Sequence, residues 1–267
     1  MQPTFLANNG RKANPGTPPS FDRWRERLLA AEQSAGWLAE CDDAGRFLAV
    51  SRELVDALAA MLRQLAGDGP VLEVCAGSGE LAQALACVGV RMQAVDTGPV
   101  GPGRRPRPDV EHSLDAQVPS GGRDLQGSEH SQRAQRQVPF SERDLQGRDL
   151  QVLPMSAEAA LRRFLPKVVL GAFVPFDGGV DEAVLACPTV EHYVVLNARL
   201  GGSLGSPTLW QATNWNAEPL DPVRRWMLTR HDVWLDQPGW SCADLLQHGE
   251  AWLFTRTSSP SAERACR

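Results

Sequence analysis

Apolar and polar positions change their spacing several times between residues 20 and 257. Residues 71–74 are a short apolar run typical of a buried strand, and the small residues 75–79 cannot continue it. Residues 81–88 then carry apolar side chains at helical spacing, and residues 91–96 are a second apolar run ending in an acid. This order predicts strand, tight turn, helix and strand, the first half of a βαβ unit. In such units, ligands bind beyond the carboxyl ends of the strands.

Two helical segments are expected before this unit. Residues 21–40 alternate charged with apolar side chains, which indicates an amphipathic helix. Ser51 is suited to cap a second helix over residues 52–66. The Asn-, Gly- and Pro-rich residues 1–19 and the polar residues 258–267 are expected to be disordered tails.

Strand and helix patterns return in the second half of the chain. Apolar runs predict strands at 150–155, 167–173, 192–198 and 251–255, with a short one at Gly239. Helical spacing predicts helices at 156–165, 181–187 and from 221 onward. The Trp-rich residues 207–219 are expected to be irregular. Alternating strands and helices that end in a pair of strands predict an α/β fold, with a mostly parallel sheet and one antiparallel strand near its C-terminal end.

Residues 98–149 differ in composition from both halves. The stretch QVPSGGRDLQG at 117–127 returns as QVPFSERDLQG at 137–147, and RDLQ occurs again at 148–151. Because the repeat has almost no apolar side chains, it cannot bury a core, and we expect a flexible, low-complexity insertion. A solenoid is the alternative, but the copies are too few and too hydrophilic to stack.

Composition narrows the class of protein and partner. The 267 residues are 42% hydrophobic, enough for one α/β domain with additions. A net charge of −5 gives no support for a nucleic-acid partner. No apolar run is long enough to cross a bilayer, and the N-terminus has no apolar core of a secretory signal, so we expect a cytoplasmic protein. Six cysteines without metal-ligand spacing predict reduced thiols and no metal site.

Three kinds of ligand compete for the turn at residues 75–79. A phosphate-binding loop fails because no Lys-Ser/Thr pair follows Gly79. A dinucleotide is compatible with Gly77, Gly79 and Ala82, although this pattern alone is weak. The third ligand is S-adenosylmethionine, which carries an ammonium group and no phosphate. Asp96 can accept the ribose hydroxyls of either cofactor, whereas Glu73 suits an ammonium and would repel a pyrophosphate.

The stretch EVCAGSG, followed by Asp96, resembles motif I and the next acidic motif of class I S-adenosylmethionine-dependent methyltransferases. The family pattern is acid-x-Gly-x-Gly-x-Gly, and Cys75 replaces its first glycine. The resemblance implies a doubly wound, seven-stranded sheet with helices on both faces, in which the last hairpin supplies the antiparallel strand. It implies a methyltransferase-like domain over residues 70–257, interrupted by the insertion and preceded by a helical extension over residues 20–69.

The resemblance also implies roles for individual residues. Cofactor contacts from the first two motifs fall on Glu73, Cys75, Ala76, Gly77, Ser78, Gly79, Asp96 and Thr97. Ser156 and Ala157 are expected beside the adenine after the third strand, and Asp115-Ala116 is the alternative position. Phe173 and Pro175, after the fourth strand, are expected to face the cofactor. Only Pro175 and the aromatic residue after it match the Asn/Asp-Pro-Pro-aromatic motif of amino-group methylases, so that motif does not identify the acceptor.

Candidates for the acceptor side are less specific. Asp177 is the first candidate for a general base, and a turn or helix-capping role is an equal alternative. Phe176, Trp210 and Trp215 are candidate substrate contacts, although the two indoles could equally pack a loop against the sheet. We expect methyl transfer to a small molecule, with S-adenosylmethionine as the cofactor.

Two other functions stay open at this point. The first is an NAD-dependent oxidoreductase, which lacks the expected Tyr-x-x-x-Lys pair because Asn197 stands four residues after Tyr193. The second is a non-catalytic, methyltransferase-like scaffold that binds a protein partner through the insertion. The replacement of the first motif glycine by Cys75 keeps this second alternative open.

Overall fold

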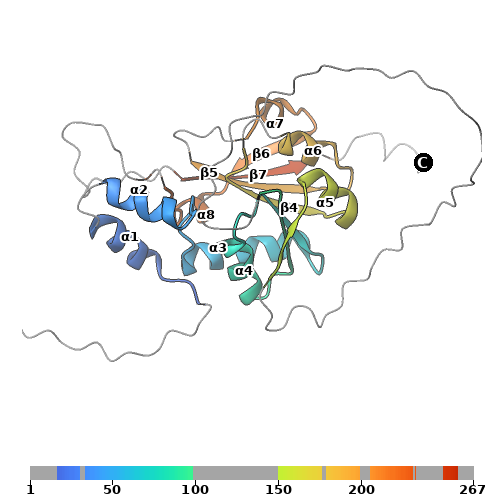
Figure 1. Ribbon diagram of the computed structural model, residues 1–267. Coiled ribbons are helices and arrows are strands. Elements are labelled where there is room, and N and C mark those ends of the chain that lie inside the picture. Colours follow the sequence, from blue (N-terminus) through green and yellow to red (C-terminus); the bar gives the residue numbers. More distant parts are fainter. Residues whose placement is uncertain are drawn as a thin grey trace, which may run out of the picture. The chain divides into compact units, whose positions relative to one another are not determined.

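The computed structural model describes residues 17–30, 34–98, 150–175, 179–198, 205–230, 232 and 249–257 (Figure 1). The helices are α1 (Phe21–Ala30), α2 (Ser34–Asp43), α3 (Arg52–Ala66), α4 (Glu80–Cys87), α5 (Ala157–Phe164), α6 (Val180–Ala186), α7 (Pro207–Gln211) and α8 (Asp221–Arg224). The strands are β1 (Val71–Val74), β2 (Met92–Asp96), β3 (Val152–Pro154), β4 (Val168–Ala172), β5 (His192–Ala198), β6 (Trp215–Pro219) and β7 (Gly249–Arg256). In this part of the chain, no helix has the length and apolarity needed to cross a bilayer.

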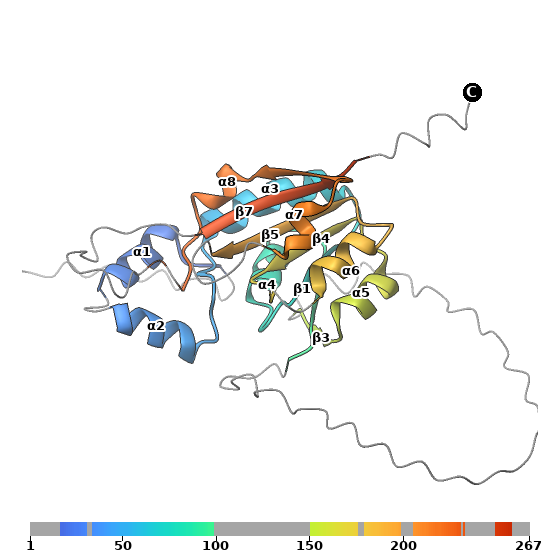
Figure 2. The same cartoon turned by 90° about the horizontal axis from the view of Figure 1, so that it is seen from above.

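The strands form one seven-stranded sheet in the order β3-β2-β1-β4-β5-β7-β6. Strands β1 to β5 pair in parallel. Strand β7 is antiparallel to both of its neighbours, β5 and β6 (Figure 2). The predicted α/β fold, with a mostly parallel sheet and antiparallel pairing near its C-terminal end, is therefore confirmed.

The structure decides where the third strand lies. Strand β3 falls within the predicted run 150–155 and pairs with β2, with Pro154 opposite Asp96. The alternative at 115–116, the RDLQ repeats and the strand expected at Gly239 lie outside the described residues. The prediction of irregular structure over 207–219 is wrong, because this segment contains α7 and β6.

Residues of the same strand pack alternately into two core clusters. Val71, Val168 and Leu170 join the cluster that contains the buried faces of α3 and α4. Leu72 and Val169 join a second cluster with α5, α6 and α7. Since neighbouring side chains of a strand point to opposite faces, both faces of the sheet are covered by helices. Burial on both faces explains why these strands read as continuous apolar runs.

Two predicted helix caps are present. The Ser51 hydroxyl accepts a hydrogen bond from the Leu54 amide (3.2 Å) at the start of α3. The Ser156 hydroxyl accepts one from the Ala159 amide (3.2 Å) at the start of α5. Each cap satisfies an amide that has no partner within its helix. The Ser156 cap also fixes the first turn of α5 at the carboxyl end of β3.

The N-terminal extension has its own small core. The prediction of one helix over residues 21–40 is wrong, because the structure has two helices here: α1 ends at Ala30 and α2 begins at Ser34. Trp24 and Trp37 are buried, and their ring centroids lie 6.3 Å apart. The Trp37 indole N–H donates to the carbonyl of Thr229 (3.2 Å). These contacts attach α1 and α2 to the sheet domain at the end where β7 begins (Figure 2).

Candidate functional site

Strands β1 and β4 are neighbours at the middle of the sheet. The chain passes from β1 to β2 on one side and from β4 to β5 on the other, so ligands are expected beyond the carboxyl ends of β1 and β4. Cys75 follows β1 with φ of 56°, and Phe173 follows β4 with φ of 57°. Positive φ is uncommon for residues other than glycine, and such strained residues cluster at functional sites. Two of them therefore flank the crevice that the topology indicates.

The turn after β1 keeps its conformation without the first glycine of the motif, because Cys75 adopts the left-handed backbone. The Ala76 amide donates to the carbonyl of Val95 (3.0 Å), and the Gly79 amide donates to the carbonyl of Ala76 (2.8 Å). Gly79 is required for two reasons. Its φ is 77°, and a Cβ there would lie 2.5 Å from Val152 Cγ2.

Glu73 is buried beneath this turn, with only 2% of its surface exposed. Its Oε2 atom has no hydrogen-bond partner among the residues that the structure describes. Burial raises the pKa of the carboxyl to about 8, against a smaller opposing effect of the Ala82 amide, while the charge of Asp96 adds to the rise. A buried acid with an unpaired oxygen is costly, which marks this position for a polar or cationic partner.

Asp96 connects the ends of the first two strands. Its Oδ2 atom accepts a hydrogen bond from the Gly77 amide (2.7 Å), and its Oδ1 atom accepts one from the Gly98 amide (2.6 Å). Each carboxylate oxygen has two lone pairs, so both can accept a second hydrogen bond. The carboxylate is therefore held by the backbone with acceptor capacity to spare.

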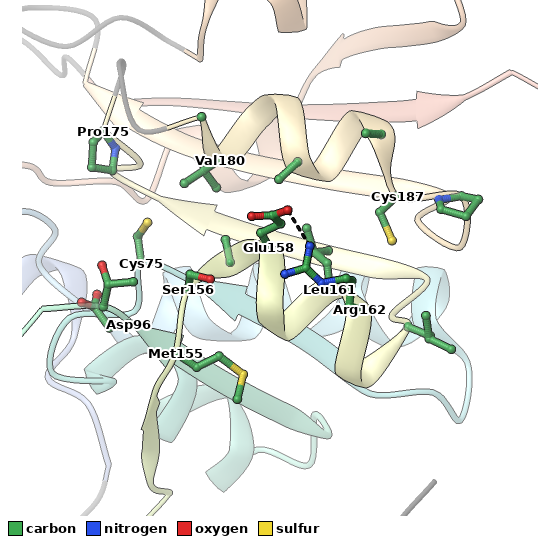
Figure 3. A pocket seen from close by; sticks show the side chains of 17 residues that line it. Cys75, Asp96, Met155, Ser156, Glu158, Leu161, Arg162, Pro175, Val180 and Cys187 are labelled. Carbon is green, nitrogen blue, oxygen red and sulfur yellow. Dashed lines mark hydrogen bonds and ion pairs between the residues drawn. The ribbon is translucent and has the colours of Figure 1, made fainter. Parts of the chain in front are cut away.

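A cavity of about 690 Å³ begins at this edge of the sheet and runs between α5 and α6 (Figure 3). This volume is within the range of small-molecule sites. Six residues predicted to bind the cofactor line it: Cys75, Asp96, Thr97, Ser156, Ala157 and Pro175. Figure 3 shows Cys75 and Asp96 at one end and Cys187 at the other. We call this cavity the α5–α6 groove.

The groove is largely apolar beyond its acidic end. Its apolar lining includes Leu161, Val180 and Ala183. Two charged residues of α5, Glu158 and Arg162, also line the groove and form an ion pair with each other (2.5 Å; Figure 3). Burial raises the pKa of the Cys75 thiol to about 11, and the charge of Asp96 adds to this effect. Since the thiolate is the nucleophilic form of cysteine, the Cys75 thiol is neutral and unreactive at physiological pH.

The other described residues predicted to bind the cofactor, Glu73 among them, do not line the groove. Ala76, Gly77, Ser78 and Gly79 form the turn between β1 and α4. Phe173 packs against the core cluster on the opposite, α3–α4 face of the sheet. Phe176 and Asp177 lie outside the described residues, so the expected general base stays a prediction.

The two candidate tryptophans are not brought to the groove. Trp215 pairs with Arg256 near the amino end of β5, at the edge of the sheet opposite the crevice. The Arg256 guanidinium lies 4.4 Å from its ring centroid. Trp210 packs edge-on against Trp252 (5.0 Å) and Phe254 (5.1 Å). Both indoles pack against the sheet, the alternative considered for them above.

One buried polar pair near the site was missed by the sequence patterns. The Tyr193 hydroxyl donates to Asp181 Oδ1 (2.8 Å), and the Ser206 amide donates to Asp181 Oδ2 (2.5 Å). Gly171 makes room for the phenol, because a Cβ there would lie 2.8 Å from the Tyr193 oxygen. Two sequence features could have pointed to this pair: an acid in the first turn of a predicted helix and the only tyrosine of the chain.

This pair is structural in character. Both side chains are buried, and burial together with the charge of Asp181 raises the pKa of Tyr193 well above its usual value. The phenol is thus held protonated and hydrogen-bonded to Asp181, whereas a tyrosine that transfers protons must be able to ionise. The pair links β5, α6 and the start of α7 behind the groove.

Comparison with known proteins adds no relative: no protein-family model and no curated protein sequence matches this chain.

Proposed function

We propose that this chain binds S-adenosylmethionine and transfers its methyl group to a small-molecule acceptor. Glu73 carries the proposal. Its buried carboxyl has an unpaired Oε2 beneath the turn that follows β1, where a cationic ligand would satisfy it. The methionine part of the cofactor supplies an ammonium group, which stabilises the ionised form of a neighbouring acid.

Asp96 supports the same ligand and disfavours a dinucleotide. A pyrophosphate bound at the turn would need free amides, but the Gly77 amide already donates to Asp96 Oδ2. Two acids, Glu73 and Asp96, would also repel it. The spare lone pairs of Asp96 suit a pair of ribose hydroxyls, which are neutral donors.

The α5–α6 groove could hold the adenosine part of S-adenosylmethionine. Ser156 and Ala157 begin α5 beside Asp96 and Thr97, and Pro175 stands across the groove at the end of β4. These residues combine polar side chains with the apolar Ala157 and Pro175, a lining that suits a base attached to a ribose. The strand order, with one reversed strand near its C-terminal end, agrees with the doubly wound arrangement that the resemblance to methyltransferases implies.

When bound, S-adenosylmethionine would supply an activated methyl group, which an acceptor lone pair would take as the carbon–sulfur bond breaks and S-adenosylhomocysteine leaves. The chain would then contribute by positioning the methyl donor and the acceptor and by excluding water from the site. Asp96 would fix the ribose, Glu73 would balance the ammonium, and the neutral Cys75 thiol would present an unreactive surface at the end of the groove.

Two substitutions test the proposal through binding of S-adenosylhomocysteine, measured by equilibrium dialysis. Asp96→Ala removes both acceptor oxygens, and we expect affinity to fall by on the order of 100-fold. The control Asp56→Ala removes an exposed acid of α3 and should leave affinity unchanged. Equal affinity in the two variants would contradict the assignment of Asp96, and no binding to the unmodified chain would contradict the function.

A further inference from the structure

Residues 46–48 cross the carboxyl ends of β1 and β4. The Arg230 amide donates to the carbonyl of Phe47 (2.9 Å), and Leu48 forms an antiparallel bridge with Thr229. Arg46 pairs with Glu80, the first residue of α4 (Nε to Oε2, 3.4 Å). This short segment is thereby fixed across the crevice between the two strands.

The Phe47 ring lies against the residue that follows β4. Its centroid is 5.6 Å from that of Phe173, with the two planes inclined by 31°. Phe47 is 48% exposed, which is high for an aromatic side chain held by a fixed backbone. Phe173 has a positive φ of 57°, so the backbone is strained where the two rings meet. We call these two rings the aromatic rim.

The aromatic rim lies on the other side of Cys75 from the α5–α6 groove. Phe173 packs with the α3–α4 core cluster, whereas Cys75 packs with the α5–α6 cluster and lines the groove. Val74 and Gly171 are paired directly beneath, so the two positions are neighbours across the ends of β1 and β4. A ligand that lies along the groove, with one end at Cys75, would have that end next to the aromatic rim.

Among the described residues, the two arginines beside Phe47 are each paired with an acid. Arg230 Nη1 lies 2.9 Å from Asp42 Oδ1, and its guanidinium is 5.7 Å from the Phe47 centroid. Arg46 is paired with Glu80, as described above. With Arg46 and Arg230 paired and the Cys75 thiol neutral, the two rings themselves offer a flat, apolar surface. Such a surface favours aromatic and apolar groups over ions.

We propose that Phe47 and Phe173 form the acceptor-binding wall, and that the methyl acceptor is a small, uncharged molecule with a flat aromatic face. This inference rests on the proposed function, because the rim is an acceptor site only if the groove holds the methyl donor. It replaces the indoles of Trp210 and Trp215 as the aromatic contacts to the acceptor. The acceptor atom would lie between the rim and the end of the groove.

Three matched probes test this inference on the full-length chain saturated with S-adenosylhomocysteine. They are 2-naphthol, which is neutral, 2-naphthoate, an anion, and 2-naphthylmethylamine, a cation, each titrated by fluorescence. We expect 2-naphthol to bind at least about 10-fold more tightly than either ion. Tighter binding of an ion, or no binding of any probe, would overturn the inference while leaving the cofactor proposal intact.

Substitutions of Phe47 and Trp210 test whether 2-naphthol binds at the aromatic rim. Phe47→Ala should weaken 2-naphthol about 5-fold or more without changing the affinity for S-adenosylhomocysteine, and Phe47→Leu, which keeps apolar bulk, should have a smaller effect. Trp210→Ala removes another exposed aromatic side chain and should change neither affinity. If Trp210→Ala weakens 2-naphthol and Phe47→Ala does not, the acceptor wall is not the rim. If S-adenosylhomocysteine itself fails to bind the unmodified chain, the proposed function fails, and this inference falls with it.

Discussion

Glu73 shows how one buried carboxyl affects both stability and binding. In the unfolded chain it ionises near its ordinary pKa of 4.5, whereas burial raises its pKa to about 8 in the folded protein. Between these values the folded state binds more protons than the unfolded state, so the free energy of unfolding falls as pH rises through this window. Below about pH 4.5 both states hold the proton, and the penalty is absent.

The substitution Glu73→Gln keeps the shape of the side chain and removes its charge. We expect it to stabilise the ligand-free protein increasingly as pH rises from 5 to 8, by up to about 1.4 kcal/mol per pH unit. Urea unfolding at several pH values measures this difference. The same variant should bind S-adenosylmethionine more weakly, because a neutral amide cannot balance an ammonium.

Glu218→Gln is the matched control, since Glu218 is an exposed acid of the edge strand β6. It should not change how stability depends on pH. An identical pH dependence in Glu73→Gln and in the unmodified protein would show that Glu73 does not titrate between pH 5 and 8.

The turn between β1 and α4 allows a test at the scale of an element. Gly79 and Gly77 both have positive φ, but only at Gly79 would a Cβ collide with Val152. We expect Gly79→Ala to lower the free energy of unfolding by about 2–4 kcal/mol and Gly77→Ala by about 1 kcal/mol. Urea unfolding of both variants makes the comparison. Equal losses would mean that the turn does not pack against β3 as described.

The pair of Asp181 and Tyr193 predicts a second effect on stability. Tyr193→Phe leaves Asp181 Oδ1 without its buried donor, and we expect a loss of about 1–3 kcal/mol in the free energy of unfolding. Binding of S-adenosylhomocysteine should stay within about 2-fold, since this pair lies behind the groove. A double-mutant cycle with Asp181→Ala should be non-additive. Additive losses, or a large loss of binding alone, would contradict the structural role.

The elements differ in how far sequence patterns could predict them. Strands β1, β2, β4 and β5 are buried on both faces, so each appears as a continuous apolar run. Strand β6 is at the sheet edge and buries only Trp215, while its other four residues are exposed. It therefore has no alternation to detect, and Pro219 is tolerated at its end because the strand is at an edge.

The site divides in the same way. Glu73 and Asp96 could be predicted because Glu73 lies one residue before the end of β1 and Asp96 ends β2, both recognisable strands. The Asp181–Tyr193 pair could not, because it depends on the packing of α6 against β5. The contact between Phe47 and Phe173 joins residues that are far apart in the sequence, so it likewise emerges only from the folded chain.

At the scale of the whole molecule, the part of the chain that the structure describes contains a seven-stranded sheet and the residues named as lining the groove. None of these residues comes from the predicted insertion between Gly98 and Leu150. We expect deletion of residues 116–147 to leave the melting temperature and the affinity for S-adenosylhomocysteine essentially unchanged, as measured by thermal unfolding and equilibrium dialysis. A deletion variant that does not fold would show that the repeats belong to the domain.

The most direct test of the central claim is calorimetric titration of the purified, full-length chain with S-adenosylmethionine, S-adenosylhomocysteine and NAD. Glu73 and Asp96 flank the turn with two acids, so the account predicts saturable 1:1 binding of both adenosyl ligands and none of NAD. Tight binding of NAD without binding of either adenosyl ligand would contradict it.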